Sequence, residues 1–74
     1  MRAVIDRKGE PFAYLQGKTL YTLDGEVTGR LADGYIVDVA GNRRWRVVGD
    51  GLYALDGSET IGYLGEPVAD DYWR

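Results

Sequence analysis

Side chains that could carry out catalysis are scarce in this sequence of 74 residues. It contains no His and no Cys, and its one Ser, Ser58, follows Gly57 in a segment typical of a turn. Without a His to activate its hydroxyl, Ser58 is expected to be a turn residue rather than a nucleophile. The missing His and Cys also exclude a Cys/His zinc site. We therefore expect neither an enzyme nor a bound cofactor or metal.

Acidic residues form the most regular polar set. One Asp follows each of four short apolar segments: Asp6, Asp24, Asp38 and Asp56. An Asp side chain can accept hydrogen bonds from the backbone ahead of it, so we expect these residues to shape tight turns. The alternative is a ring of carboxylates that binds a hard cation. Repeated positions in a ring lie apart, and no compact D-x-D-x-D loop occurs, so the turn role is favoured.

The segment 43–46, Arg-Arg-Trp-Arg, is the one local patch that is both basic and aromatic. Alternation along a strand would place Arg44 and Arg46 on one face and Trp45 on the other. We expect Trp45 to fill the core, because the equivalent positions hold small residues: Ala13, Gly29 and Gly62. The alternative is an exposed platform on which a base or sugar could stack.

Aromatic and basic residues recur on the face that we expect to point away from the core. One row consists of Tyr14, Arg30, Arg46 and Tyr63, and the row two residues earlier of Phe12, Thr28, Arg44 and Ile61. The simplest interpretation is a solvated surface on which Arg stems cover apolar area and stack on Tyr. The sharper hypothesis is a surface that binds a carboxylate-bearing peptide, a phosphate or an acidic segment of a partner. Its candidate binding residues are Tyr14, Arg30, Arg44, Arg46 and Tyr63.

These residues are spaced by an internal duplication. Positions 6–25 align without a gap on positions 38–57, and both halves contain the motif Leu-Tyr-x-Leu-Asp-Gly. A unit of about 16 residues recurs within each half. Each unit has β-forming residues at period two and a turn rich in Asp and Gly, which predicts a β-hairpin. The sequence thus predicts an all-β fold of four sequential hairpins in a pseudo-fourfold ring or barrel-like arrangement.

Two aliphatic columns are expected to meet at the centre of this ring. The first column contains Ile5, Leu23, Val37 and Leu55, and the second contains Leu15, Leu31, Val47 and Leu64. We expect one domain over residues 1–65, followed by a tail over 66–74 in which Pro67 marks the break. Tyr72 and Trp73 in this tail are expected to dock on the domain or on a second copy, with disorder as the alternative.

Size and charge set further expectations. A core this small supplies only about 3–5 kcal/mol, and self-association is one way to supplement it. We therefore expect a homo-oligomer, most simply a twofold dimer, or a complex with a protein partner. The net charge of −3 gives no reason to expect nucleic acid or an anionic membrane as partner. No targeting segment or long apolar run is evident, so a cytoplasmic location is expected.

The repeated Leu-Tyr-x-Leu-Asp-Gly at 20–25 and 52–57, with Gly-x-Leu at 29–31 and 62–64, resembles the four-fold β-flower family. The resemblance spans roughly residues 3–65, and Ala13 and Trp45 depart from it where the other repeats have Gly. It implies a small bacterial domain of four hairpins, and it brings no catalytic residue.

Two classes of function remain open from the sequence. The first, which we favour, is a non-enzymatic structural or protein-interaction module that self-associates. The second is a module that binds a small anion, a sugar or a peptide through the outward Tyr and Arg residues.

Overall fold

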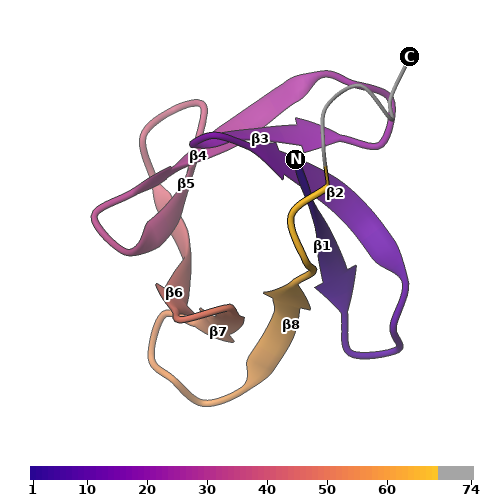
Figure 1. Ribbon diagram of the computed structural model, residues 1–74. Coiled ribbons are helices and arrows are strands. Elements are labelled where there is room, and N and C mark those ends of the chain that lie inside the picture. The colour runs from indigo at the N-terminus through magenta and orange to yellow at the C-terminus, as the bar shows by residue number, and fades with distance from the viewer. Residues whose placement is uncertain (69–74) are drawn as a thin grey trace.

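The fold consists of antiparallel strands alone. The computed structural model describes residues 1–68, and within them it contains eight strands and no helix (Figure 1). The strands are β1 (Arg2–Asp6), β2 (Pro11–Gln16), β3 (Thr19–Thr22), β4 (Val27–Ala32), β5 (Tyr35–Asp38), β6 (Arg43–Val48), β7 (Gly51–Ala54) and β8 (Thr60–Leu64). The predicted all-β fold of four hairpins is confirmed.

The strands close into a barrel. Each strand pairs with its neighbours in chain order, and β1 also pairs with β8, so the four hairpins surround a common centre (Figure 1). Closure leaves none of the eight described strands with an unpaired edge, which removes the usual route by which a sheet recruits another strand. Association of this barrel with another molecule must therefore use side chains.

The barrel has two distinct ends. We call one end the turn mouth, where the four hairpin turns lie at residues 7–10, 23–26, 39–42 and 55–59. The linker mouth lies at the other end, where the hairpins are joined at residues 17–18, 33–34 and 49–50. The connections at the turn mouth are thus longer than those at the linker mouth.

One hydrogen-bonding pattern recurs in every hairpin at the turn mouth. The amides of Gly9, Gly25, Gly41 and Gly57 each donate to the carbonyl three residues earlier, at 2.9–3.0 Å. All four glycines have positive φ, from 76° to 92°, a conformation that a side chain disfavours. The carbonyls that accept these bonds belong to Asp6, Thr22, Asp38 and Ala54.

This register corrects the alignment expected from the sequence. Asp6 and Asp38 are equivalent to Thr22 and Ala54, whereas Asp24 and Asp56 lie two residues further on, inside their turns. The Asp-Gly pairs of the second and fourth turns resemble strand ends in sequence, and only the hydrogen bonds distinguish them.

The shift in register also corrects the first aliphatic column. Leu23 and Leu55 lie in turns and are 54% and 44% exposed, while Ile5 is half-buried and only Val37 is buried. The column that fills the centre lies one residue earlier in the first and third hairpins and three residues earlier in the others. It consists of Val4, Leu20, Ile36 and Leu52, which are evenly spaced along the chain.

The second aliphatic column is confirmed. Leu15 and Leu64 are buried, and Leu31 and Val47 are half-buried against the core. Pairing across neighbouring hairpins, for example Leu15 with Leu20, interleaves this column with the central one. The two columns fill the middle of the barrel and its linker mouth.

Arg2 stabilises the place where the barrel closes, between β1 and β8. Its Nε donates to the carbonyl of Gly65 at 2.7 Å, and its Nη2 forms an ion pair with Asp50 at 2.8 Å. Beyond β8 the chain stays beside β1, because the amide of Val68 donates to the carbonyl of Met1 at 2.7 Å. The backbone pairing thus extends past residue 65, into the first residues of the predicted tail.

Candidate functional site

A β-bulge in every hairpin shapes the interior of the turn mouth. The register of each second strand shifts by one residue relative to its partner, as between Val4/Ile5 and Ala13/Pro11. The same irregularity recurs in the other three hairpins. Such a bulge leaves one extra residue outside the ladder and re-aims its side chain. The extra residues are Phe12, Thr28, Arg44 and Ile61.

The bulges overturn the expectation that this row points away from the core. Phe12 and Ile61 pack against the core, and Phe12, Thr28 and Arg44 line a partly open cavity. Simple alternation failed here because the extra residue interrupts the period of two in each hairpin. Arg44, a candidate residue for an outward binding surface, instead belongs to the barrel mouth.

We call this space the mouth cavity. It has a volume of about 350 Å³, and the polar groups around it come from the ends of strands nearest the turns. It is lined by Phe12, Ala13, Leu20, Thr22, Thr28, Ile36, Asp38, Arg44 and Trp45. These residues come from the first three hairpins, so the cavity lies off the pseudo-fourfold axis.

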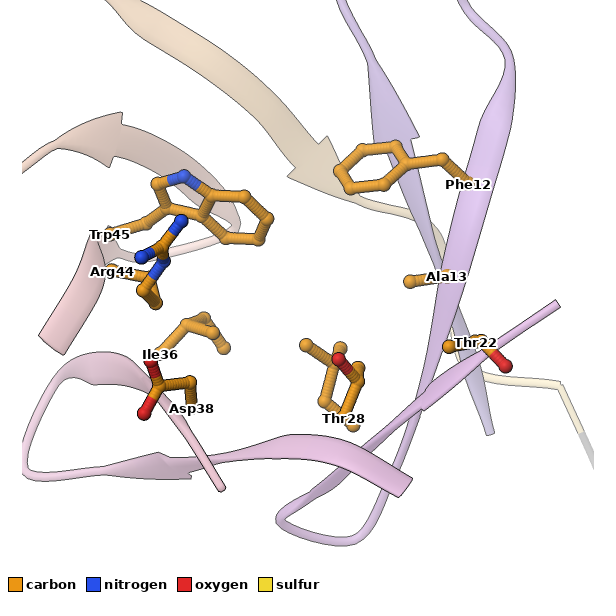
Figure 2. Close-up of a pocket in the computed structure, with 9 residues that line it drawn as sticks. Phe12, Ala13, Thr22, Thr28, Ile36, Asp38, Arg44 and Trp45 are labelled. Carbon is orange, nitrogen blue, oxygen red and sulfur yellow. The ribbon is translucent and has the colours of Figure 1, made fainter. Parts of the chain in front are cut away.

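Two aromatic side chains contact each other at the mouth cavity. Phe12 from β2 and Trp45 from β6 point toward one another (Figure 2), with ring centroids 5.9 Å apart and an interplanar angle of 84°. This edge-to-face geometry is a favourable one for aromatic pairs. Trp45 packs against the core but is only half-buried, so the expectation that it fills the core is confirmed in part.

Glycines at two of the positions equivalent to Trp45 allow neighbouring strands to approach closely. A Cβ added at Gly29 would collide with the carbonyl oxygen of Val37, and one added at Gly62 with that of Ile5. Neighbouring hairpins therefore approach each other closely at these two glycines. Two of the four repeats thus have a closely approaching backbone at this level, and the third repeat has the large ring of Trp45.

Asp38 places a carboxylate on the rim. Its Oδ1 accepts hydrogen bonds from the amides of Ala40 at 3.0 Å and Asn42 at 2.9 Å. The hydrogen bond from the Asn42 amide, together with the bond from the Ala40 amide and a smaller effect of the nearby Arg44 guanidinium, lowers the pKa of Asp38 below its ordinary value. Asp38 is therefore ionised at neutral pH, on the same side of the mouth cavity as Arg44 (Figure 2).

The expected role of the Asp residues in turns is confirmed for three of them. Asp6 accepts from the amides of Lys8 and Glu10, in the same geometry as Asp38. Asp56 accepts from the amide of Ser58 at 2.9 Å, and hydrogen bonds from Ser58 lower the pKa of Asp56. Ser58 is thus a turn residue, as expected. Among residues 1–68, no group of three or more potential metal ligands comes together.

Exposed aliphatic side chains surround the turn mouth. The first residue of each hairpin turn lies at positions 7, 23, 39 and 55, and three of the four are apolar. We call Leu23, Val39 and Leu55 the apolar crown; they are 54%, 71% and 44% exposed. Val27, 56% exposed, lies beside it and lines a shallow cavity of about 250 Å³ together with Val39.

Three members of the predicted outward row are exposed, and the fourth, Tyr14, is half-buried. The members of this row, Tyr14, Arg30, Arg46 and Tyr63, come from β2, β4, β6 and β8, none of which are neighbours. The barrel distributes them around its circumference and does not bring them to one site. Arg43 makes a cation–π contact with Tyr35 at 4.3 Å, the kind of Arg–Tyr stacking expected for this surface. Tyr72 and Trp73 lie outside the described residues.

Sequence reasoning missed the apolar crown and the contribution of Phe12 and Asp38 to one cavity. The even spacing of positions 7, 23, 39 and 55 was the available signal. Asp24 and Asp56 obscure this signal, because they lie two residues later in their hairpins than Asp6 and Asp38 do.

Comparison with known proteins places the fold. A family model described as 4-fold beta flower protein matches residues 1–50, which is more than half of the chain, so the chain belongs to that family. No curated protein and no solved structure matched. Within residues 1–68, no helix has the length and apolar character needed to span a membrane.

Proposed function

We propose that this β-flower domain is a non-enzymatic interaction module that self-associates. The apolar crown carries the proposal: three exposed aliphatic residues project from the turns around one end of the barrel. Apolar side chains that are exposed at the same end of a barrel can be covered together by one partner, and exposed apolar surface of this kind marks interaction sites. The absence of His and Cys supports a role without catalysis.

The small size of the domain supports the same proposal. A chain of 74 residues without disulfides has little core, and burial against a second copy would add to it. The net charge of −3 favours a protein partner over nucleic acid or an anionic membrane, and we propose a cytoplasmic location.

Sedimentation velocity over a range of concentrations tests this proposal. We expect a dimer to appear at tens of micromolar and to dissociate on dilution. A species of monomer mass at every concentration, up to the limit of solubility, would contradict self-association.

The mouth cavity favours a second candidate, a module that binds a small ligand. Phe12 and Trp45 offer an aromatic surface, and Arg44 and Asp38 offer a cation and an anion beside it. This arrangement suits a small anion, a sugar or a peptide side chain, the ligands considered for the outward surface. The barrel mouth gathers these groups more closely than the outer surface gathers the Tyr and Arg residues.

Fluorescence of Trp45 tests the second candidate. In a Trp73→Phe background, Trp45 is the one remaining Trp, so its emission reports on the mouth cavity. We would titrate sodium phosphate, glucose and a tripeptide separately. A saturable change that Arg44→Ala weakens would support ligand binding, and unchanged emission with all three probes would contradict it.

A further inference from the structure

We propose that the mouth cavity binds an α-ammonium group that lies beside a carbonyl or carboxylate oxygen, on a residue with an apolar side chain. Free leucine and a peptide that begins with leucine both carry this chemistry. The inference rests on the second candidate function, the ligand-binding module, and names the class of its ligand. In the complex, Asp38 accepts a hydrogen bond from the ammonium, Arg44 donates to the oxygen, and the apolar side chain fills the cavity.

The two charged residues of the mouth cavity have opposite signs and lie on the same side of it (Figure 2). Among residues 1–68, the ion pair that the structure shows joins Arg2 to Asp50. Asp38 and Arg44 are thus near each other without forming one. They present one anion and one cation to a molecule that enters the mouth cavity.

A ligand with groups for both charges suits this pair better than a ligand with a single charge. A simple anion such as phosphate is attracted by Arg44 and repelled by Asp38, and the reverse holds for a simple cation. An α-ammonium group next to a carbonyl or carboxylate oxygen supplies one partner to each residue. Hydrogen bonds that involve an ionised group are also stronger than those between neutral groups.

The inner part of the mouth cavity is apolar. Ala13, Leu20 and Ile36 are buried there, and none of them is more than 4% exposed. Phe12 and Trp45 add two half-buried aromatic rings to the wall. An apolar side chain is therefore favoured inside, whereas a sugar would place hydroxyl groups against aliphatic side chains that offer them no hydrogen bond.

The volume of the mouth cavity limits the ligand to a small group. At about 350 Å³, it lies near the lower end of the range for ligand pockets, about 300–1,000 Å³. One apolar side chain with its α-amino group fits such a space. Because the cavity is partly open, the rest of a peptide would extend from it into solvent.

A series of related ligands tests the chemistry. Binding is followed through the emission of Trp45 in the Trp73→Phe protein, and we expect a saturable change with L-leucine and with the tripeptide Leu-Gly-Gly. Isocaproate, which is leucine without its ammonium, should bind about tenfold more weakly than leucine. Isoamylamine, which is leucine without its carboxylate, should bind about threefold more weakly, because Arg44 is exposed and its attraction is screened. The tighter of leucine and Leu-Gly-Gly identifies the source as a free amino acid or a peptide amino terminus.

A first matched pair of variants tests the carboxylate. Asp38→Asn removes the charge and keeps a side-chain oxygen for the turn amides. Asp6→Asn makes the same change in a turn with the same hydrogen bonds, but Asp6 does not line the mouth cavity. We expect Asp38→Asn to weaken leucine binding about tenfold and Asp6→Asn to leave it unchanged.

A second matched pair tests the guanidinium. Arg44 lines the mouth cavity, whereas the guanidinium of its neighbour Arg43 lies 4.3 Å from the centre of the Tyr35 ring. Arg44→Gln should weaken leucine binding about threefold, and Arg43→Gln should leave it unchanged. Circular dichroism would establish that the variants fold; if Asp38→Asn does not, the Arg44→Gln pair and the ligand series carry the test.

The outcomes separate this inference from the candidate function on which it rests. If phosphate or glucose changes the emission while leucine and Leu-Gly-Gly do not, the cavity binds another class of ligand and the inference is overturned. Unchanged emission with every probe would overturn the inference together with the ligand-binding candidate. Equal binding of leucine and isocaproate, or equal losses in Asp38→Asn and Asp6→Asn, would contradict the assigned roles and leave ligand binding intact.

Discussion

Two leucines three residues apart distinguish the observed core from the one expected from the sequence. Leu52 is 0% exposed and belongs to the central column, whereas Leu55 lies in the fourth turn and is 44% exposed. Replacement of a fully buried Leu by Ala costs about 2–5 kcal/mol, because it removes apolar contacts and leaves a cavity. Replacement of the exposed Leu55 should cost less than about 1 kcal/mol.

The size of the domain makes this difference easy to measure. A domain of 74 residues is expected to have a free energy of unfolding of only about 3–5 kcal/mol, so Leu52→Ala should remove most of it. With a urea m-value of about 1 kcal/mol/M, the unfolding midpoint should fall by about 2 M or more. Leu55→Ala should shift the midpoint by less than about 1 M.

Urea unfolding followed by circular dichroism is the assay. It should be carried out at about 1 µM protein, because association would otherwise stabilise the folded state of one variant more than the other. Equal losses for Leu52→Ala and Leu55→Ala, or a larger loss for Leu55→Ala, would refute the register of the core.

Three further substitutions or conditions test other parts of the structure. Asp33 has a φ of 53° where the equivalent linker positions hold Gly, so Asp33→Gly should raise the free energy of unfolding by about 0.5–1 kcal/mol; a loss would contradict strain at this residue. Gly62→Ala should lower it by about 1–3 kcal/mol, since the new methyl would meet the backbone of Ile5; unchanged stability would mean that β1 and β8 separate easily. The lowered pKa values of Asp38 and Asp56 stabilise the folded state above about pH 4, and this stability is lost as the pH falls through the folded values. Acid titration of the unfolding midpoint should therefore show a decline below about pH 4 that Asp38→Ala reduces, and an identical decline in that variant would argue against the role of the turn hydrogen bonds.

The four-hairpin architecture was predictable because the turn residues recur at a regular spacing. Four turn glycines recur at equal intervals along the chain: Gly9, Gly25, Gly41 and Gly57. Each has a positive φ, which favours glycine at that position. Together with alternating β-forming residues, this period was sufficient to predict four hairpins. The closed barrel then follows from the need of each hairpin to bury one face.

The candidate site was less predictable for a physical reason. One extra residue at each bulge reverses the direction expected from alternation, so Phe12 and Arg44 enter the mouth although the period of two assigns them to the outer face. A bulge has no reliable signature in a single sequence, because the same residues could continue a regular ladder. The inward position of Trp45 was predictable because the equivalent positions hold the small residues Ala13, Gly29 and Gly62.

The most direct test of the turn mouth as the binding face is a dilution series followed by amide NMR. With uniformly labelled protein, we expect the amide shifts of residues 7–10, 23–26, 39–44 and 55–59 to move with concentration along one dimerisation curve. The amides of the linker mouth, at 17–18, 33–34 and 49–50, should stay fixed. Concentration-dependent shifts at the linker mouth or around the outer wall, with the turns unaffected, would contradict the assignment of the turn mouth as the binding face.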